Sequence, residues 1–204
     1  MPKHRPQDHF GRRAKAQGYA ARSVFKLQEI DRRLTLLRPG QRVLDLGAAP
    51  GSWSQYASER VGERGVVIAV DLEPLRVAAP SLRSVQRDIA QLDEQDLCGI
   101  TEFDVVLSDM APHTSGQRQR DQFRSYELYM AALRAAERWL APGGFFVGKI
   151  FQGPELQQAR DATRELLGSV RVLKPEASRS ESYEVFLAAG PWKGRRTSPG
   201  ADPR

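Results

Sequence analysis

The sequence has few of the residues that cross-link small proteins and no run of the kind that crosses a membrane. Its 204 residues include a single cysteine, Cys98, and three histidines. One cysteine excludes an intramolecular disulfide framework and a multi-cysteine metal site. No apolar run approaches the roughly 18 residues of a membrane span, and the opening MPKHRPQDHFGRR has no apolar core of a secretory signal. We therefore predict a cytoplasmic protein without membrane association.

The composition is that of an ordinary globular protein, but the charge is unevenly distributed. The net charge is +6, and residues 1–38 hold ten Lys and Arg against three acids. Residues 39–190 sum to −4 and residues 191–204 to +3. We predict three parts: a basic helical extension over 1–38, one globular domain over 39–190, and a disordered basic tail over 191–204. The basic extension favours a nucleic-acid partner, although a solvated terminus accounts equally well for the charge alone.

Short apolar runs alternate with helical stretches after residue 38, which predicts βαβ units and a mainly parallel sheet. The expected strands are Val43–Leu46, Val66–Val70, Val85–Gln86, Val105–Leu107, Phe145–Ile150, Val170–Leu173 and Val185–Ala188. The expected helices cover 7–17, 23–36, 53–61, 92–98, 122–140 and 155–167. Ser23 is expected to cap its helix, and Ala-Pro-Gly-Gly to end the long one. The last two strands lack a helix-length spacer, so they are expected to pair antiparallel.

The first predicted strand leads into a loop of small residues, DLGAAPGSW. Such a loop, at the carboxyl end of the first strand, is where a doubly wound sheet binds a nucleotide-like ligand. Gly47 and Gly51 allow the backbone to approach the ligand closely. A dinucleotide loop would instead read G-x-G-x-x-G and hold a pyrophosphate. The spacing therefore predicts a nucleoside ligand without a pyrophosphate and disfavours NAD.

Acidic residues occur at the ends of successive predicted strands. Asp71 is positioned to accept hydrogen bonds from ribose hydroxyls, and Asp88 from an adenine amino group. Trp53 is a candidate to pack against the ligand. Together with Asp45 and Asp109, these carboxylates suit a cationic ligand such as a sulfonium. The structural alternative is that each aspartate caps a turn or helix.

Three charged residues near strand ends and one on a helix are candidate catalytic groups. Asp109 ends the fourth strand in SDMAP, Lys149 lies in the apolar run GKIFQG, and Glu184 opens the last strand. Lys26 lies on the helix over 23–36. A cap, an edge charge and an exposed lysine are the structural alternatives for Asp109, Glu184 and Lys26. Lys149 is hardest to explain structurally, because charges are rarely buried without a partner.

These residues lie in blocks that resemble the FtsJ/RrmJ-type ribosomal RNA 2′-O-ribose methyltransferases, specifically the large-subunit methyltransferase E family. The blocks are ARSVFKLQEID, VLDLGAAPGSWSQ, AVDLEP, LSDMAPHTSG, LAPGGFFVGKIFQG and SRSESYEVFLAAG. The resemblance runs from about Gly18 to Gly190. It implies a Rossmann-like class I methyltransferase fold with seven mostly parallel strands, an antiparallel last strand and helices on both faces. Ser52 departs from the family, which commonly has a second glycine there, and Val24 stands where an aromatic residue is common.

The resemblance also implies a cofactor and roles for the candidate residues. The cofactor is S-adenosyl-L-methionine, contacted by Gly51, Trp53, Asp71, Asp88 and Asp109, with Gly47 in the same loop. The catalytic tetrad is Lys26, Asp109, Lys149 and Glu184. We interpret Lys149 as the general base for a ribose 2′-hydroxyl, or as the group that orients and polarises it. Lys26 could hold the attacking oxygen, and no metal is needed because the leaving thioether is neutral.

The substrate follows partly from chemistry and partly from the resemblance. A 2′-hydroxyl distinguishes RNA from DNA, and unpaired nucleotides are the easier targets. The resemblance implies a uridine in the A-loop of large-subunit (23S) ribosomal RNA, in an assembled or assembling subunit, and we expect a monomer. The alternatives are a transfer RNA 2′-O-methyltransferase, a non-catalytic RNA-binding assembly factor and an NAD-dependent oxidoreductase. The predicted RNA-binding residues are Arg12, Arg13, Lys15, Arg22, Arg32 and Arg33.

Overall fold

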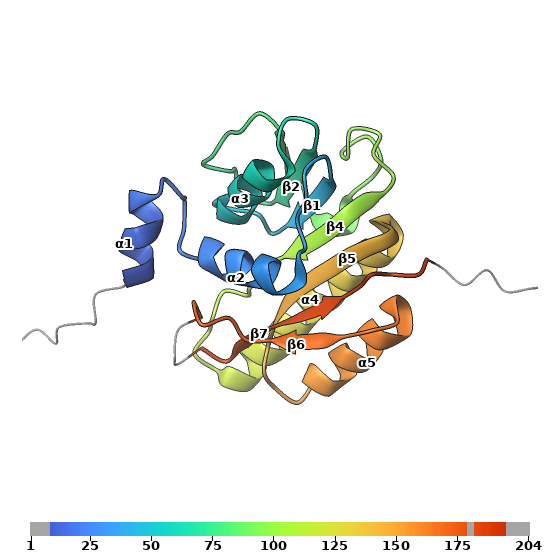
Figure 1. Ribbon diagram of the computed structural model, residues 1–204. Helices are drawn as coiled ribbons and strands as arrows, with labels where there is room; N and C mark the ends of the chain where they lie inside the picture. Colours follow the sequence, from blue (N-terminus) through green and yellow to red (C-terminus); the bar gives the residue numbers. More distant parts are fainter. Residues whose placement is uncertain (1–8, 179–181, 195–204) are drawn as a thin grey trace, which may run out of the picture.

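The computed structural model describes residues 9–178 and 182–194, and one mixed sheet forms its centre (Figure 1). The strand order is β3-β2-β1-β4-β5-β7-β6. β7 runs antiparallel to both of its neighbours, while β1 to β5 pair parallel. The strands are β1 (Arg42–Leu46), β2 (Val66–Asp71), β3 (Leu82–Gln86), β4 (Phe103–Ser108), β5 (Leu140–Phe151), β6 (Arg171–Leu173) and β7 (Glu184–Ala189). This confirms the predicted seven-stranded sheet with its antiparallel last strand.

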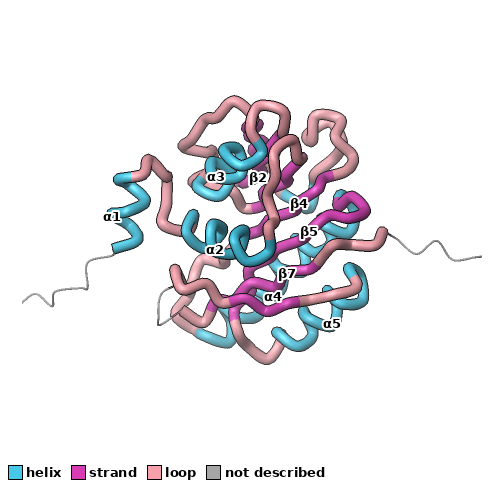
Figure 2. Tube along the Cα trace, in the orientation of Figure 1, coloured by secondary structure: helices cyan, strands magenta, loops and turns pink. Residues whose placement is uncertain are grey.

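Helices cover both faces of the sheet, as Figure 2 shows. They are α1 (His9–Ala16), α2 (Val24–Leu34), α3 (Ser52–Val61), α4 (Arg118–Trp139) and α5 (Leu156–Leu167), with a 3-10 turn over Ile89–Gln91. α2 and α3 pack on one face and α4 and α5 on the other, which confirms the Rossmann-like architecture. α1 lies beside α2, away from the sheet (Figure 1). No helix in the described ranges has the length and apolarity to span a membrane.

The apolar strands are explained by burial on both sides. In β1, Val43 packs with α2 and α3, whereas Leu44 and Leu46 pack in the core under α4. Successive side chains of a strand point to opposite faces, so a sheet covered on both faces needs apolar residues at every position. This is why the strands appear in the sequence as continuous apolar runs rather than as alternating patterns.

Two local predictions are wrong. Residues 92–98 form turns rather than a helix. Asp93 and Asp96 accept from each other's backbone N–H groups, at 2.9 and 3.3 Å, as at a helix start, but Cys98 and Gly99 take φ of +56° and +73° and end it after a single turn. Ser23 does not cap α2 through its side chain; its hydroxyl bonds the hydroxyl of Ser52 at 2.8 Å. The long helix ends at Trp139, and the Ala-Pro-Gly-Gly segment already belongs to β5.

The reversal of strand order beside β1 positions the candidate site. The chain passes from β1 outward to β2 and β3, and returns to place β4 on the other side of β1. Ligands of such sheets bind in the crevice outside the carboxyl ends of the strands at this point. Gly47, with φ +70°, begins the loop after β1, and a Cβ there would lie 2.2 Å from Cγ of Met110. Glycine therefore lets the loops after β1 and β4 close together.

The predicted tail lies mostly outside the described residues, which end at Gly194. Trp192, within that tail, is buried and donates its indole N–H to the Leu166 carbonyl at 3.2 Å. In the predicted N-terminal extension, Leu27 and Ile30 of α2 belong to the same core as α3 and β1. Residues 1–8, 179–181 and 195–204 are outside the described part.

Candidate active site

A pocket of about 550 Å³ opens at the carboxyl edge of the sheet, where the strand order reverses. Four of the predicted cofactor residues line it: Gly47, Asp71, Asp88 and Asp109. The rest of its wall is largely apolar, with contributions from Leu72, Ile89, Met110, Leu128 and Ala131. The pocket thus combines carboxylates with an apolar slot, a combination that fits a positively charged nucleoside.

Two of these carboxylates also organise the backbone around the pocket. Asp71 accepts hydrogen bonds from the Ala49 N–H at 2.8 Å and the Glu73 N–H at 2.9 Å. Asp88 accepts from the Ala90 N–H at 2.9 Å and caps the 3-10 turn. Asp71 and Asp88 therefore do hold turns in place, as the structural alternative expected, and both also line the pocket. Their backbone bonds fix the carboxylates in place before any ligand arrives.

Asp45 is a buried carboxylate behind this pocket, 1% exposed. One oxygen accepts a hydrogen bond from the Ser54 hydroxyl at 2.5 Å, and the other has no hydrogen-bond partner in the described part of the chain. Burial, opposed by the Ser54 hydrogen bond and aided by the nearby Asp109 and Asp71, raises the pKa of Asp45 to about 7. The carboxylates of the crevice thus disfavour a further negative charge at Asp45.

We call the pocket of about 550 Å³ the carboxylate pocket. Gly51 and Trp53 are not among the residues that line it. A Cβ on Gly51, whose φ is +113°, would lie 2.3 Å from Cγ2 of Val77, so this glycine lets the β2–β3 loop pack on the loop after β1. Trp53 is 2% exposed and donates its indole N–H to the Ser23 carbonyl at 2.8 Å. It lines a smaller cavity together with Ser23, Gly47 and Asp109.

The four predicted catalytic residues form two ion pairs. Lys149 Nζ lies 2.8 Å from Oδ1 of Asp109 and also donates to the carbonyl of Asp109. Lys26 Nζ lies 2.5 Å from Oε1 of Glu184. All four side chains are 17% exposed or less. Each lysine is therefore held in place by a carboxylate, as a buried charge requires.

The two ion pairs meet at a second pocket, of about 450 Å³. Lys26, Lys149 and Glu184 line it, and Tyr183 and Phe151 add an aromatic wall. Ala111 lines both this pocket and the carboxylate pocket. The smaller cavity connects them through shared residues, because Ser23 borders the second pocket while Gly47 and Asp109 border the first. A group bound in one pocket is thus adjacent to a group bound in the other.

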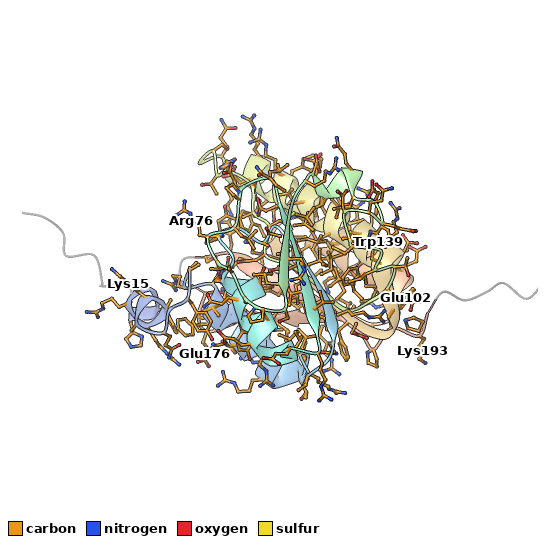
Figure 3. All side chains as sticks on the ribbon, turned by 90° about the horizontal axis from the view of Figure 1, so that it is seen from above. Lys15, Arg76, Glu102, Trp139, Glu176 and Lys193 are labelled. Atoms are coloured by element: carbon orange, nitrogen blue, oxygen red, sulfur yellow. The ribbon has the colours of Figure 1, made fainter. Side chains whose placement is uncertain are left out.

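The predicted RNA-binding residues are divided among four environments. Arg12 and Lys15 are exposed on α1, and Figure 3 places Lys15 on the side opposite Lys193. Arg22 borders the second pocket and donates to the Ala177 carbonyl at 2.8 Å. Arg33 pairs with Glu29 within α2.

Arg13 and Arg32 line a third cavity, of about 580 Å³, between α1 and α2. The Arg13 guanidinium lies 4.6 Å from the centre of the Phe25 ring, a cation–π contact that holds α1 to α2. Buried Glu29 and Asp31 share this cavity, so its charge is mixed. α1 thus presents its basic residues beside α2, and none of them lines the second pocket.

Several pocket residues were not expected from the sequence. Leu128 and Ala131 of α4 line the carboxylate pocket, and Tyr183 lines the second one. A leucine or alanine on a helix carries no local signal of a binding role. Tyr183 could have been suspected because it directly precedes Glu184. No group of three or more His, Cys, Asp or Glu within the described ranges is arranged to hold a metal ion.

The fold, compared with solved structures, defines the class of protein. A ribosomal RNA methyltransferase, described as putative, from Plasmodium falciparum superimposes with a TM-score of 0.76 at 24% identity, over 87% of this chain and all of that one. Fibrillarin of Aeropyrum pernix, solved with natively bound S-adenosyl-L-methionine, gives 0.56 at 17% identity, over 75% of this chain and 67% of that one. The chain has the Rossmann-like fold of the methyltransferases.

The sequence comparisons are more specific. The FtsJ-like methyltransferase family matches residues 19–191. A relative from Sorangium cellulosum named ribosomal RNA large subunit methyltransferase E is 58% identical over 187 residues, which cover 91% of this chain and 88% of the relative. A relative of the same name from Bdellovibrio bacteriovorus is 46% identical over 89% of this chain and 95% of its own length. The chain belongs to the FtsJ-like methyltransferase family.

Proposed function

We propose that the protein transfers a methyl group from S-adenosyl-L-methionine to a ribose 2′-hydroxyl of a uridine in large-subunit ribosomal RNA. The observation that carries the proposal is the pair of buried lysine–carboxylate contacts at the junction of two pockets, one acidic and one bordered by basic residues. A methyl donor and a hydroxyl acceptor need two adjoining sites that open onto the same catalytic groups. The second pocket provides the acceptor site.

The carboxylate pocket fits the proposed cofactor. Asp71 would accept from the ribose hydroxyls and Asp88 from the adenine amino group, with Ile89 and Leu72 beside the ring. With a pKa of about 7, Asp45 is only partly ionised at neutral pH, and a bound sulfonium or ammonium group would favour its charged form beneath the pocket. When bound, S-adenosyl-L-methionine supplies an electrophilic methyl group on its sulfonium.

The tetrad acts on the acceptor hydroxyl. Asp109 fixes Lys149 through two hydrogen bonds at the edge of the carboxylate pocket. Glu184 fixes Lys26 on the other side of the second pocket. Two ammonium groups directed at one small volume would orient an incoming 2′-hydroxyl and stabilise the negative charge that develops on its oxygen.

The proton of that hydroxyl must leave during the transfer. Lys149 is the nearer lysine to the carboxylate pocket, since its partner Asp109 lines that pocket. We assign Lys149 to act on the hydroxyl, as general base or as the ammonium that polarises it, and Lys26 to hold the oxygen. A general base must be unprotonated before the step, whereas a polarising ammonium must be protonated. The direction in which the rate changes with pH therefore separates the two roles of Lys149.

The substrate assignment rests on the relatives. Those from Sorangium and Bdellovibrio carry the name ribosomal RNA large subunit methyltransferase E, at 58% and 46% identity. On this basis we propose the A-loop of 23S ribosomal RNA as target. We further propose that the enzyme acts as a cytoplasmic monomer on assembling or assembled large subunits during ribosome biogenesis.

The decisive experiment supplies purified protein with methyl-labelled S-adenosyl-L-methionine and three acceptors. These are large ribosomal subunits from cells lacking the protein, the free ribosomal RNA of those subunits, and transfer RNA. Label on the large subunits, mapped to a 2′-O-methyluridine in the A-loop, is the expected result. Label on transfer RNA alone would show that transfer RNA, and not ribosomal RNA, is the substrate. The absence of label on all three acceptors would favour a non-catalytic RNA-binding factor.

A further inference from the structure

The first turns of α4 carry a basic and aromatic surface that the proposed tetrad and cofactor site do not use. Arg118 and Arg120 are exposed there and Arg124 is half-buried. Phe123, with half of its surface exposed, lies three residues after Arg120 and one before Arg124, so these three share one face of the helix, while Arg118 lies toward the opposite face. Three large apolar side chains are exposed in the described part of the chain, Leu72, Phe123 and Val172, and Phe123 alone is aromatic. We call Arg118, Arg120, Phe123 and Arg124 the α4 patch.

One residue of the α4 patch, Arg118, lies beside the second pocket. The Arg118 guanidinium lies 5.4 Å from the centre of the Tyr183 ring, and Tyr183 lines that pocket. Tyr183 in turn packs edge-on against Phe151 at 4.7 Å, in the same wall. Figure 1 shows the start of α4 on the same side of the molecule as α1. Arg22 and Lys26 line the second pocket, and Arg118 of the α4 patch lies against Tyr183 in its wall.

The α4 patch is fixed relative to the pocket by a hydrogen-bonded loop. The backbone N–H and the hydroxyl of Ser115 donate to Oδ1 of Asp121 at 2.9 and 2.8 Å. The backbone bond from Ser115 holds the pKa of Asp121 below its ordinary value, so the carboxylate stays charged at neutral pH. Because Ala111 and Thr114 of the same loop line the second pocket, the start of α4 is tied to the wall of that pocket.

We propose that the α4 patch binds a single-stranded stretch of the substrate RNA next to the nucleotide in the second pocket, with Phe123 stacking on a base. The inference rests on the proposed function, which makes RNA the substrate. Arginines beside an exposed aromatic ring are typical of surfaces that bind single-stranded RNA, because guanidinium groups bind phosphates and an aromatic ring stacks on any base. Arg120 would contact a phosphate and Arg118 would align Tyr183 against the target nucleotide.

The test compares Phe123→Ala and Arg120→Gln with controls from outside the α4 patch. Arg134→Gln changes an exposed arginine further along the same helix, and Val172→Ala changes an exposed apolar residue of β6. Figure 3 places Trp139, the last residue of α4, on the side away from Lys15, so the far end of this helix is a suitable reference. Two measurements are made: KM and kcat on large subunits, and affinity for single-stranded oligouridine across salt concentrations.

Phe123→Ala is expected to weaken oligouridine binding roughly tenfold with an unchanged salt slope, because stacking is lost and no charge is removed. Arg120→Gln is expected to lower the salt slope by about 0.7, the value for one phosphate contact on a single strand. Both should raise KM on large subunits and leave kcat unchanged, and both controls should match the wild type.

The proposal is overturned if both α4-patch variants behave like Arg134→Gln. It is also overturned if they raise KM on large subunits but bind oligouridine normally, since the patch would then dock a ribosomal protein. A wild-type protein that methylates no RNA would contradict the proposed function instead. The oligouridine measurement would still decide whether the α4 patch binds RNA.

Discussion

Asp45 is the residue whose charge is least compensated at the candidate site. Its pKa of about 7 lies above the ordinary value of 3.8, because burial disfavours the charged carboxylate. Between pH 3.8 and about pH 7, Asp45 holds a proton in the folded protein that it releases in the unfolded chain. The free energy of unfolding therefore falls as the pH rises through this window. Near this pKa Asp45 is only partly ionised, and a cation bound in the pocket would favour its charged form.

Asp45→Asn should remove this dependence. At pH 5 the variant and the wild type are both neutral at this position, so their denaturant midpoints should lie close together. At pH 8 the variant should be the more stable by an order of a few kcal/mol, since one pKa unit corresponds to about 1.4 kcal/mol. Asp161→Asn on exposed α5 is the control. An equal difference between Asp45→Asn and wild type at both pH values would contradict the assignment.

Lys149 is the residue on which the proposed chemistry depends. Lys149→Ala should lower the rate of methyl transfer by at least about 100-fold, the usual scale for loss of an acid–base group. Cofactor affinity should stay nearly unchanged, because Lys149 borders the second pocket and not the carboxylate pocket. Single-turnover assays and titration calorimetry measure the two effects.

Lys193→Ala, an exposed lysine on the far side of the molecule (Figure 3), is the matched control. Because the alanine variant also leaves a cavity in a buried position, Lys149→Met, which keeps most of the side-chain volume, should be tested with it, and thermal unfolding should show that both variants are folded. Near-normal methylation by either folded variant would refute the role of Lys149.

At the scale of elements, α2 links the predicted RNA-binding segment to the catalytic groups. Its Lys26 reaches Glu184 at the start of β7, and Trp53 of α3 anchors the residue before the helix through the Ser23 carbonyl. Leu27 and Ile30 pack in the core beside them. The helix places Lys26 rigidly, so this lysine, one of ten basic residues in the first 38, is separated from the exposed cations of α1.

Arg12 and Lys15 of α1 should act differently from Lys26. Replacing both by glutamine should weaken RNA binding and lower the salt slope by up to about 1.4, at 0.7 for each phosphate contact. Turnover at saturating RNA should be retained, whereas Lys26→Gln should reduce it. Arg13 is kept because its guanidinium packs on Phe25.

Filter binding of ribosomal RNA across salt concentrations measures this effect. Arg64→Gln, in the exposed turn before β2, serves as the control. A double variant of Arg12 and Lys15 whose salt slope equals that of Arg64→Gln would show that α1 does not bind RNA.

The elements themselves were largely predictable. The seven strands lie within a few residues of the predicted runs, because a sheet buried on both faces requires apolar residues throughout. β5 is longer than expected, since Leu140 already pairs with Phe103 before the register shifts. The predicted helix over 92–98 fails because Cys98 and Gly99 take positive φ and end it after a single turn. A local backbone conformation of this kind is not visible in hydrophobic periodicity.

At the scale of the whole molecule, the carboxylate pocket should couple ligand binding to stability. S-adenosyl-L-methionine at 100 times its Kd adds about 2.7 kcal/mol to the free energy of unfolding. For a chain of this length that raises Tm by roughly 5–10 °C. NAD should give no shift, because the loop after β1 lacks the pyrophosphate-binding glycines. Differential scanning fluorimetry with both ligands measures this.

Gly47→Val should abolish the shift, since its side chain would collide with Met110 and displace the loop. Gly143→Ala, near the start of β5 where a Cβ meets no atom within 4 Å, is the control for a glycine with positive φ. Equal shifts with NAD and S-adenosyl-L-methionine, or an unaltered shift in Gly47→Val, would contradict the cofactor assignment.

The sequence by itself determined the alternation of strands and helices, the loop after β1 and the identity of the charged candidates, because these are local patterns. Only the tertiary structure decided which charges meet. Lys26 pairs with Glu184 and Lys149 with Asp109, since the sheet order brings β4, β5 and β7 side by side. It also decided that Trp53 packs under α2 and that Arg118 of the α4 patch adjoins Tyr183. Such contacts depend on the distance between segments remote in the chain, which no local pattern encodes.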